Sequence, residues 1–342
     1  MDRFDRPLLT IADMVADLKT PGCDEAAWMT YLNDASQFID NRIGNFIPIA
    51  KTIHMDGSGD RIQKMPVPLL EVTGTVMNWT TSLNTLDWLT EPDDRMWPNG
   101  PYTFLNIPPL APHQTIWLAF VHGVTVPGLW GLYELLIDLG ITVQNTTKQA
   151  AADTTLVVAD GSKISPGMVL YLDSAEQETV VSTGAPTTAV TTLSQAMSNM
   201  DDVITPANVA AANVGEQIRV DFERMLVVDK NATQWSVLRS WNKTKAAAHL
   251  AAANVDVYRT FNVNRGLNGT SAADHLNGAE ISRYAPPSDV NFLARTIAGL
   301  MKKLADSQFA GKTGDSQLGQ VFYNDAFPQR ELESIEDNYA LK

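Results

Sequence analysis

The sequence predicts an α+β protein, with N- and C-terminal helices forming a small helical bundle and a large, mostly-β insertion between them. Apolar residues recur at three- and four-residue steps in residues 24–44 and again in residues 288–304, as on the buried face of a helix. Between these segments, short alternating apolar runs are separated by Gly, Pro and Asp, which is typical of strands and turns. A polar, Gly-rich stretch from residue 308 predicts an extended C-terminal arm.

Composition limits the possible functions. The chain has 342 residues, 44% of them hydrophobic, so we expect more than one folding unit. Its formal net charge of -14 opposes a grip on nucleic-acid phosphates. Cys23 is the single cysteine, which excludes an intrachain disulfide. No stretch approaches the roughly 20 apolar residues of a membrane span, and the first residues do not form a signal peptide, so we expect a protein made in the cytoplasm with no membrane partner.

Three helices have recognisable starting residues. Thr10 and Asp13 have the spacing of a capping box at the start of a short helix. Asp24 precedes the clearest helix of the chain, and Ser288 precedes another with a regular apolar face. These signals predict two helices near the N-terminus and one after the β insertion.

The segment after the second helix predicts a β-hairpin. Residues 52–55 and 61–65 read as two short strands, and Asp56–Asp60 between them is a Gly-rich turn. Pro66 and Pro68 should end the second strand or place it on a sheet edge, because proline cannot donate a hydrogen bond to a neighbour.

An internal repeat lies within the β insertion. Residues 239–249 and 265–275 share Arg, Asn, Thr, two Ala and His at a constant separation of 26 residues. We infer two copies of one strand-turn unit, although Lys243 and Lys245 of the first copy stand where the second has Gly and Ser. Residues 185–215 are rich in Ala, Thr and Asn, and we expect them to form a long protruding loop.

The sequence shows no recognisable catalytic, cofactor or metal site. Its five histidines have no partners at the spacing of a catalytic triad or a zinc cluster. His249 and His275 close the two repeat copies, where we expect a ring nitrogen to bond a backbone carbonyl rather than a metal. Asp56–Asp60 resembles the start of a calcium loop but lacks the downstream Glu. We therefore expect no cofactor and no enzymatic activity.

Four regions follow from this pattern. We expect a helical core, a β-hairpin and β-rich region, a β insertion with the 26-residue repeat, and a C-terminal arm, comprising residues 1–46 with 286–307, 47–150, 151–285 and 308–342 respectively.

Several of these segments, in this order, resemble the head-tail connector (adaptor) proteins of tailed bacteriophages. Phe38–Gly44, followed by Met55–Asp60 and Met65–Val72, is similar to the helical core and β-hairpin of that family. Thr155–Ser162 with Pro166–Leu170, and later Asn264–His275, resemble a β-module found in phage connector and tail proteins.

The resemblance implies a connector-type helical bundle and a structural role at the head-tail interface of a virion, in a protein made in the host bacterial cytoplasm. The implied assembly is a ring of twelve copies under the portal protein. Such a ring extends the DNA channel, seals the filled head and docks the tail or the next head-completion (stopper) protein. Double-stranded DNA would pass through it without sequence-specific binding.

The C-terminal arm carries the interaction residues that we predict. Its apolar patch should become ordered by burying aromatic side chains against a neighbouring subunit or the portal, and it consists of Val321, Phe322, Tyr323, Phe327 and Pro328.

Two other functions remain open at this point. A virion decoration or glycan-binding β-module is the main alternative, and Trp235 and Trp241 on an exposed face would favour it. A cell-wall hydrolase would need a pair of carboxylates or a histidine site that the sequence does not reveal.

Overall fold

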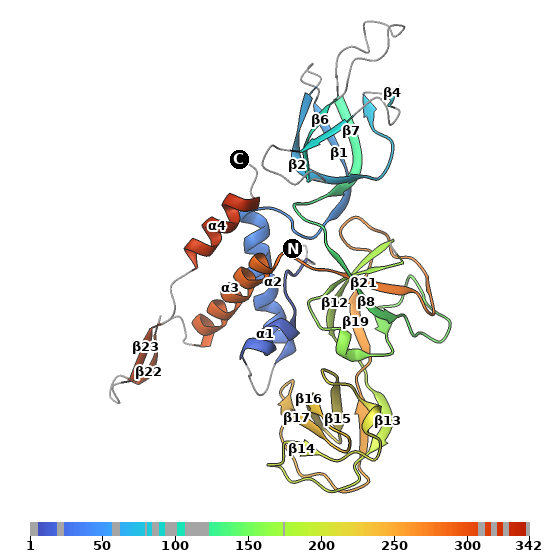
Figure 1. Ribbon diagram of the computed structural model, residues 1–342, viewed down its shortest axis with the longest axis vertical. Coiled ribbons are helices and arrows are strands. Elements are labelled where there is room, and N and C mark those ends of the chain that lie inside the picture. The colour runs from blue at the N-terminus through green and yellow to red at the C-terminus, as the bar shows by residue number, and fades with distance from the viewer. Residues whose placement is uncertain are drawn as a thin grey trace, which may run out of the picture. The chain divides into compact units, whose positions relative to one another are not determined.

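The structure is a computed structural model (Figure 1). It describes residues 6–18, 24–56, 62–78, 81–83, 89–92, 101–106, 123–173, 175–306, 312–315, 320–323 and 328–339. The chain divides into two compact units. The first contains Met1–Phe38, Leu136–Leu267 and Ser271–Glu333, and the second contains Ile39–Leu135, Asn268–Thr270 and Ser334–Lys342.

The predicted helices form where their caps indicated. Helix α1 (Ile11–Leu18) begins with a capping box, because the Thr10 N–H donates to Asp13 Oδ2 at 2.8 Å and the Asp13 N–H donates to Thr10 Oγ1 at 3.2 Å. Helix α2 (Glu25–Arg42) follows Asp24, and helix α3 (Ser288–Asp306) follows the two prolines before Ser288. The buried face of α3 consists of Val290, Leu293, Ala294, Ile297 and Ala298.

The second unit contains a seven-stranded antiparallel sheet in the order β4-β3-β7-β2-β6-β5, with β1 also paired to β7. Its buried core includes Met65, Leu69, Leu105, Val126 and Trp130. The strands are β1 (Ile49–Asp56), β2 (Ile62–Val72), β3 (Met77–Asn78), β4 (Thr81–Ser82), β5 (Leu89–Pro92), β6 (Tyr102–Asn106) and β7 (Gly123–Trp130).

The predicted hairpin between β1 and β2 is wrong in its pairing. Both strands exist, but β1 pairs with β7 along its whole length, and β2 pairs with β6 and β7. A turn sequence specifies only a local reversal of the chain and does not determine which strands pair. Strand β1 instead forms eight residue pairs with β7. The prediction for the prolines is also wrong, because β2 continues through Pro66 and Pro68 to Val72 and lies between β7 and β6. The ladder accommodates the prolines by a register shift between β2 and β6, in the interval from Lys64 to Leu69.

The first unit contains two six-stranded antiparallel sheets, which we call module 1 and module 2. Module 1 has the strand order β10-β19-β12-β11-β21-β8 and a core that includes Leu156, Leu170, Val180 and Ile281. Its elements are β8 (Leu136–Thr142), β10 (Thr155–Val157), the 3-10 helix η2 (Gly161–Lys163), β11 (Val169–Leu172), β12 (Glu176–Thr183), β19 (Thr260–Asn264) and β21 (Glu280–Tyr284). A small ladder joins β9 (Lys148–Gln149) to β20 (His275–Leu276).

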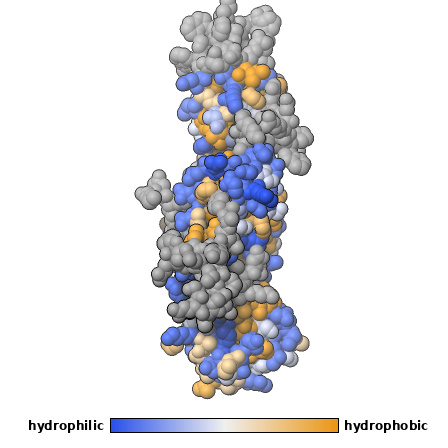
Figure 2. Space-filling model, turned by 90° about the vertical axis from the view of Figure 1, so that its left-hand side faces the viewer, coloured by the Kyte–Doolittle hydropathy of each residue, from blue (hydrophilic) through white to orange (hydrophobic). Residues whose placement is uncertain are grey.

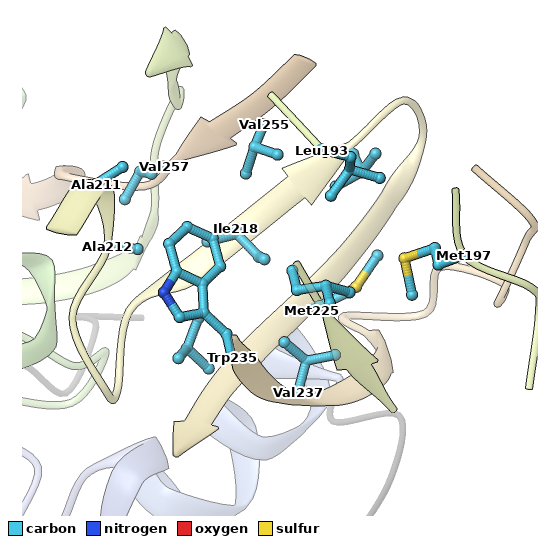
Figure 3. Packing of buried hydrophobic residues seen from close by; sticks show 13 residues of the cluster. Leu193, Met197, Ala211, Ala212, Ile218, Met225, Trp235, Val237, Val255 and Val257 are labelled. Atoms are coloured by element: carbon cyan, nitrogen blue, oxygen red, sulfur yellow. The ribbon is translucent and has the colours of Figure 1, made fainter. Parts of the chain in front are cut away.

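Module 2 has the order β13-β18-β15-β16-β17-β14 and lies in the chain between β12 and β19 of module 1. Its core packs around Trp235 with Ile218, Met225 and Val257 (Figure 3). The elements are β13 (Thr187–Thr192), β14 (Val203–Ile204), η3 (Val209–Ala211), β15 (Gln217–Val220), β16 (Glu223–Lys230), β17 (Trp235–Trp241) and β18 (Asn254–Val257). The prediction of a protruding loop over residues 185–215 is therefore wrong, because Leu193, Met197 and Ile204 from that segment are buried in this core.

The two modules are copies of one fold. Reading module 2 from β14 to β13 gives β14-β17-β16-β15-β18-β13, which matches β10-β19-β12-β11-β21-β8 strand for strand. Unusual backbone conformations coincide as well: Asn242 and Asn268 have φ values of 50° and 52°. Gly278 of module 1 has a positive φ, and so does its counterpart Ala252 in module 2. The repeat seen in the sequence is thus the C-terminal part of a complete duplication.

The predicted fold class is wrong: within the residues that the structure describes, strands account for 42% and helices for 22%, and these residues show no connector-type helical bundle. The three predicted helices form, but α1 and α2 are hydrogen-bonded to residues of module 1. The Ala12 N–H donates to Ser165 Oγ at 3.0 Å, and the Thr183 hydroxyl donates to Glu25 Oε1 at 2.9 Å. The buried apolar cores around Met65, Leu170 and Trp235 are each built by a β-sheet.

The C-terminal region contains a hairpin and a helix. Strands β22 (Lys312–Asp315) and β23 (Gln320–Tyr323) form a two-stranded antiparallel sheet, and helix α4 (Gln329–Tyr339) follows. Leu332 and Ile335 of α4 are buried. Of the helices that the structure describes, none has the length and apolarity needed to cross a membrane.

Candidate functional site

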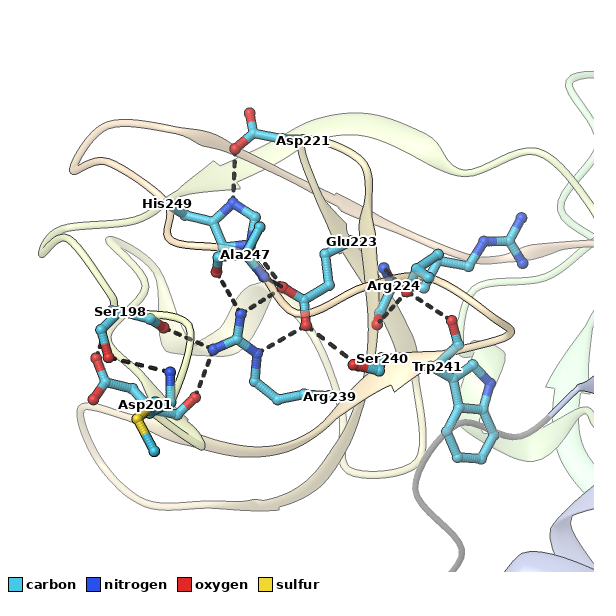
Figure 4. Close-up of polar contacts among 12 residues, drawn as sticks. Ser198, Asp201, Asp221, Glu223, Arg224, Arg239, Ser240, Trp241, Ala247 and His249 are labelled. Atoms are coloured by element: carbon cyan, nitrogen blue, oxygen red, sulfur yellow. Dashed lines mark hydrogen bonds and ion pairs between the residues drawn. The ribbon is translucent and has the colours of Figure 1, made fainter.

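Charged side chains converge at one end of module 2, around His249 (Figure 4). This histidine is buried and lies between two carboxylates: Nδ1 is 2.7 Å from Asp221 Oδ2, and Nε2 is 3.0 Å from Glu223 Oε2. Asp221 lies in the turn between β15 and β16, where it adopts a φ of 52°, and Glu223 begins β16. Both ring nitrogens therefore lie within hydrogen-bond distance of a carboxylate oxygen.

Glu223 is the centre of this network. Its carboxylate accepts hydrogen bonds from Arg239 Nε at 2.8 Å and from the Ala247 N–H at 3.0 Å, in addition to the contact with His249. Arg239 also donates to the Ser198 carbonyl at 2.7 Å and the Ala247 carbonyl at 2.6 Å. One guanidinium group therefore holds a buried carboxylate and two loops together.

These bonds determine the charge of Glu223. Burial alone would raise the pKa of this carboxyl group, but hydrogen bonds from Arg239, the Ala247 N–H and His249 outweigh burial and hold the pKa at about 2. The carboxylate is therefore ionised over the whole physiological range, as a group that anchors loops requires.

Module 1 contains the same network with different residues. His275 lies between Asp173 and Glu176, with Nδ1 and Nε2 each 2.9 Å from a carboxylate oxygen. Arg265 donates from a terminal nitrogen to Glu176 Oε2 at 2.7 Å and to the Ala273 carbonyl at 2.6 Å. Burial would raise the pKa of Glu176, but the Ala273 N–H, Arg265 and His275 lower it below its ordinary value.

The two networks differ at one buried pair. In module 1, Glu178 lies beside Gln149, whose Nε2 is 3.4 Å from Glu178 Oε2. The counterparts in module 2 are Met225 and Met197, both part of the apolar core. Burial, together with the negative charge of Glu176, raises the pKa of Glu178 to about 7, and the charge of Arg265 opposes this rise.

The distances between side chains in this cluster would allow it to bind a metal ion. Ligand atoms of Glu176, Glu178 and His275 lie within 4.8 Å of one another. However, Arg265 Nε lies 2.5 Å from Glu178 Oε1, and both nitrogens of His275 are already bonded to carboxylates. The guanidinium group therefore supplies the positive charge that a metal ion would bring.

The structure corrects the predicted role of the two histidines. His249 and His275 bond carboxylates and not the backbone carbonyls that we expected. Among the other histidines, Nδ1 of His54 is 2.8 Å from Thr125 Oγ1, while His113 and His122 lie outside the described residues. Within the described chain, the histidine networks include no serine, threonine or cysteine placed as a nucleophile.

The remaining predicted positions are separate from these networks. Val321, Phe322 and Tyr323 lie in β23, Pro328 is buried, and Phe327 lies outside the described residues, as does most of Asp56–Asp60. Trp235 and Trp241 are buried, with relative exposures of 0% and 2%, so they do not form the exposed aromatic face that a glycan-binding module would need.

Sequence reasoning missed the carboxylates of both networks. Asp173 with Glu176, and Asp221 with Glu223, occupy equivalent turns, but one turn is a residue longer than the other. This insertion hides the repeat from a comparison at constant spacing. A search for Asp followed within three residues by Glu upstream of each Arg-to-His repeat would have found them.

Comparisons with known proteins add no assignment: no protein-family model, no curated protein and no solved structure matches this chain.

Proposed function

We propose that this protein is a structural, non-enzymatic adaptor of a tailed-phage virion. It forms a homo-oligomeric ring under the portal, extends the DNA channel, and docks the tail or the next head-completion protein. The observation that carries the proposal is that the buried charged groups of both modules bond one another and anchor loops. This arrangement suits a scaffold.

A catalytic role is disfavoured by the same geometry. General acid-base chemistry needs a titrating group within reach of a substrate. His249 and His275 are buried, and each holds two carboxylates. The resemblance of the N-terminal segments and the β-module to connector proteins supports the adaptor role in particular.

The charge of the chain supports passage of DNA without binding. A formal charge of -14 repels phosphates, so a ring lined by this protein would let double-stranded DNA slide through. A basic lining would bind phosphates and slow the DNA.

The C-terminal arm supports contact with a neighbouring subunit or the portal. Strands β22 and β23 pair with each other and with no other described strand. An isolated two-stranded hairpin is marginally stable in water, so it gains order by packing against something else. The apolar patch from Val321 to Pro328 is the part of the arm that we expect to make this contact.

The test is mass photometry of the purified protein alone and with portal rings. We expect the portal peak to gain the mass of many copies of this chain. A chain truncated after Asp306 should bind the portal or assemble more weakly. An unchanged portal peak would contradict the adaptor role, and lysis of cell walls on a zymogram would contradict the non-enzymatic role.

A further inference from the structure

One end of module 2 exposes large apolar side chains. Met200, Phe222 and Leu250 are 88%, 93% and 79% exposed. The alanines at 246–248 and 251–252 beside them are also exposed. Figure 2 shows hydrophobic residues reaching the surface of module 2, the lowest part of that view. Hydrophobic groups that gather on a soluble surface mark contact sites more often than isolated ones do.

These residues belong to one end of the module, because the histidine network joins their loops. The bond from His249 to Asp221 connects the loop of Leu250 to the turn of Phe222. Met197, three residues before Met200, exchanges two backbone hydrogen bonds of 2.9 Å with His249. We call this surface the apolar end, comprising Met200, Phe222, Ala246–Ala248 and Leu250–Ala252.

Module 1 shows what this end looks like without the apolar residues. The same positions hold Ala152 for Met200, Ala175 in the turn of Phe222, and Asp274 for Ala248. Asn277 and Gly278 replace Ala251 and Ala252, and only Leu276 keeps the large side chain of Leu250. Since both ends rest on the same Arg-Glu-His network, the fold does not require the apolar residues of module 2.

The charges around the apolar end indicate the kind of partner. Asp201, Asp202 and Asp221 are exposed at its border, with Lys245 as a basic neighbour. An acidic border repels an anionic bilayer and the same border of a second copy. It attracts a protein surface in which Lys and Arg surround an apolar recess.

We propose that the apolar end of module 2 is the surface that binds the tailward protein, through a basic-rimmed apolar recess on that partner. This inference rests on the proposed adaptor function, in which the C-terminal arm contacts the neighbouring subunit or the portal. Strands β22 and β23 of that arm form a sheet separate from the module 2 sheet, so the two contacts use different parts of the chain.

The test measures binding of purified phage tails to the immobilised full-length protein. The double variant Phe222→Ser/Leu250→Ser should bind tails about tenfold more weakly or worse, since exposed aromatic and aliphatic anchors dominate such contacts. Leu276→Ser in module 1 is the matched control and should bind like the wild type. Asp202→Lys should weaken binding and reduce its dependence on salt.

Portal binding, followed in parallel by mass photometry, separates the two proposals. Loss of tail binding with portal binding retained supports the docking surface. The docking surface is overturned if the double variant binds tails normally or the wild type binds none. It is also overturned if the double substitution instead abolishes self-association or binding to phosphatidylglycerol vesicles. A wild-type protein that binds tails but not the portal contradicts the adaptor ring alone.

Discussion

Modules 1 and 2 share a strand order and an Arg-Glu-His network, yet they fill the space beside that network differently. Module 1 places Glu178 and Gln149 there, and module 2 places Met225 and Met197. The network is thus the part that the fold requires, because it satisfies the buried backbone groups of two loops. The neighbouring pair can be polar, as in module 1, or apolar, as in module 2. This agrees with the small net gain in stability that buried polar pairs give.

The largest effect should come from removing the arginine of one network. Arg239→Ala leaves the carboxylate of Glu223 buried without its main partner, which costs about 3–5 kcal/mol. Hydrogen exchange should accelerate in module 2 and much less in module 1. Arg265→Ala should give the reverse pattern. Equal protection in both modules after either substitution would show that the network does not stabilise its own module.

The next effect should come from transferring the polar residue of module 1 into module 2. Met225→Glu buries a second carboxyl group in a core of Leu, Met and Val, so we expect a loss of roughly 2–4 kcal/mol at pH 8. The loss should be smaller at pH 5, where the new carboxyl group is protonated. Adding Met197→Gln should restore part of the stability in urea unfolding, and no restoration would argue against the equivalence of the two pairs.

The reverse transfer should stabilise module 1. The pKa of Glu178 in the fold, about 7, exceeds its ordinary value of 4.5, so the folded state retains a proton that the unfolded state loses. Stability should therefore fall between pH 4.5 and pH 7, by at most about 1.4 kcal/mol per pH unit, and stay level above. Glu178→Met should remove this fall and raise stability at pH 8 by about 1–3 kcal/mol.

Glu178→Gln is the control for that experiment, since it removes the titration but keeps a polar side chain. Urea unfolding at pH 5 and pH 8 measures both variants. A wild type whose stability is the same at the two pH values would contradict the assigned shift.

The smallest effect concerns the backbone. Ala252 has a φ of 65°, whereas its counterpart Gly278 has a φ of 92° and open space where a Cβ would lie, with no atom within 4 Å. Ala252→Gly should stabilise module 2 by about 0.5–1 kcal/mol, because a side chain is strained in this conformation. Gly278→Ala should destabilise module 1 by a similar amount. Thermal unfolding followed by circular dichroism measures both, and opposite signs would refute the comparison.

Local signals in the sequence predicted local structure well. Thr10 with Asp13, and Ser288, marked helix starts because capping depends on residues within one turn. The repeat from Arg239 to His249 was visible because its residues serve one tight loop. Long-range pairing was not predictable in this way: β7 pairs with β1 across more than sixty intervening residues, and no turn signal encodes that choice.

The candidate site was only half visible for a related reason. His249 and Arg239 lie in the repeat, but their carboxylate partner Glu223 lies upstream, in a turn whose length differs between the modules. Residues 185–215 read as a loop because large apolar residues are sparse there. The few that are present, Leu193, Met197 and Ile204, are nevertheless buried in the core around Trp235.

The insertion of module 2 into module 1 has a mechanical consequence. The chain leaves through β12 and returns through β19, which are neighbours in one sheet, and the Gly184 N–H bonds the Thr260 carbonyl at 2.8 Å where the two crossings meet. Tension applied between the ends of the chain is therefore carried by the paired strands β12 and β19 and bypasses module 2. The inner module bears load only after the outer one has opened, so a pull on the protein is resisted in two successive steps.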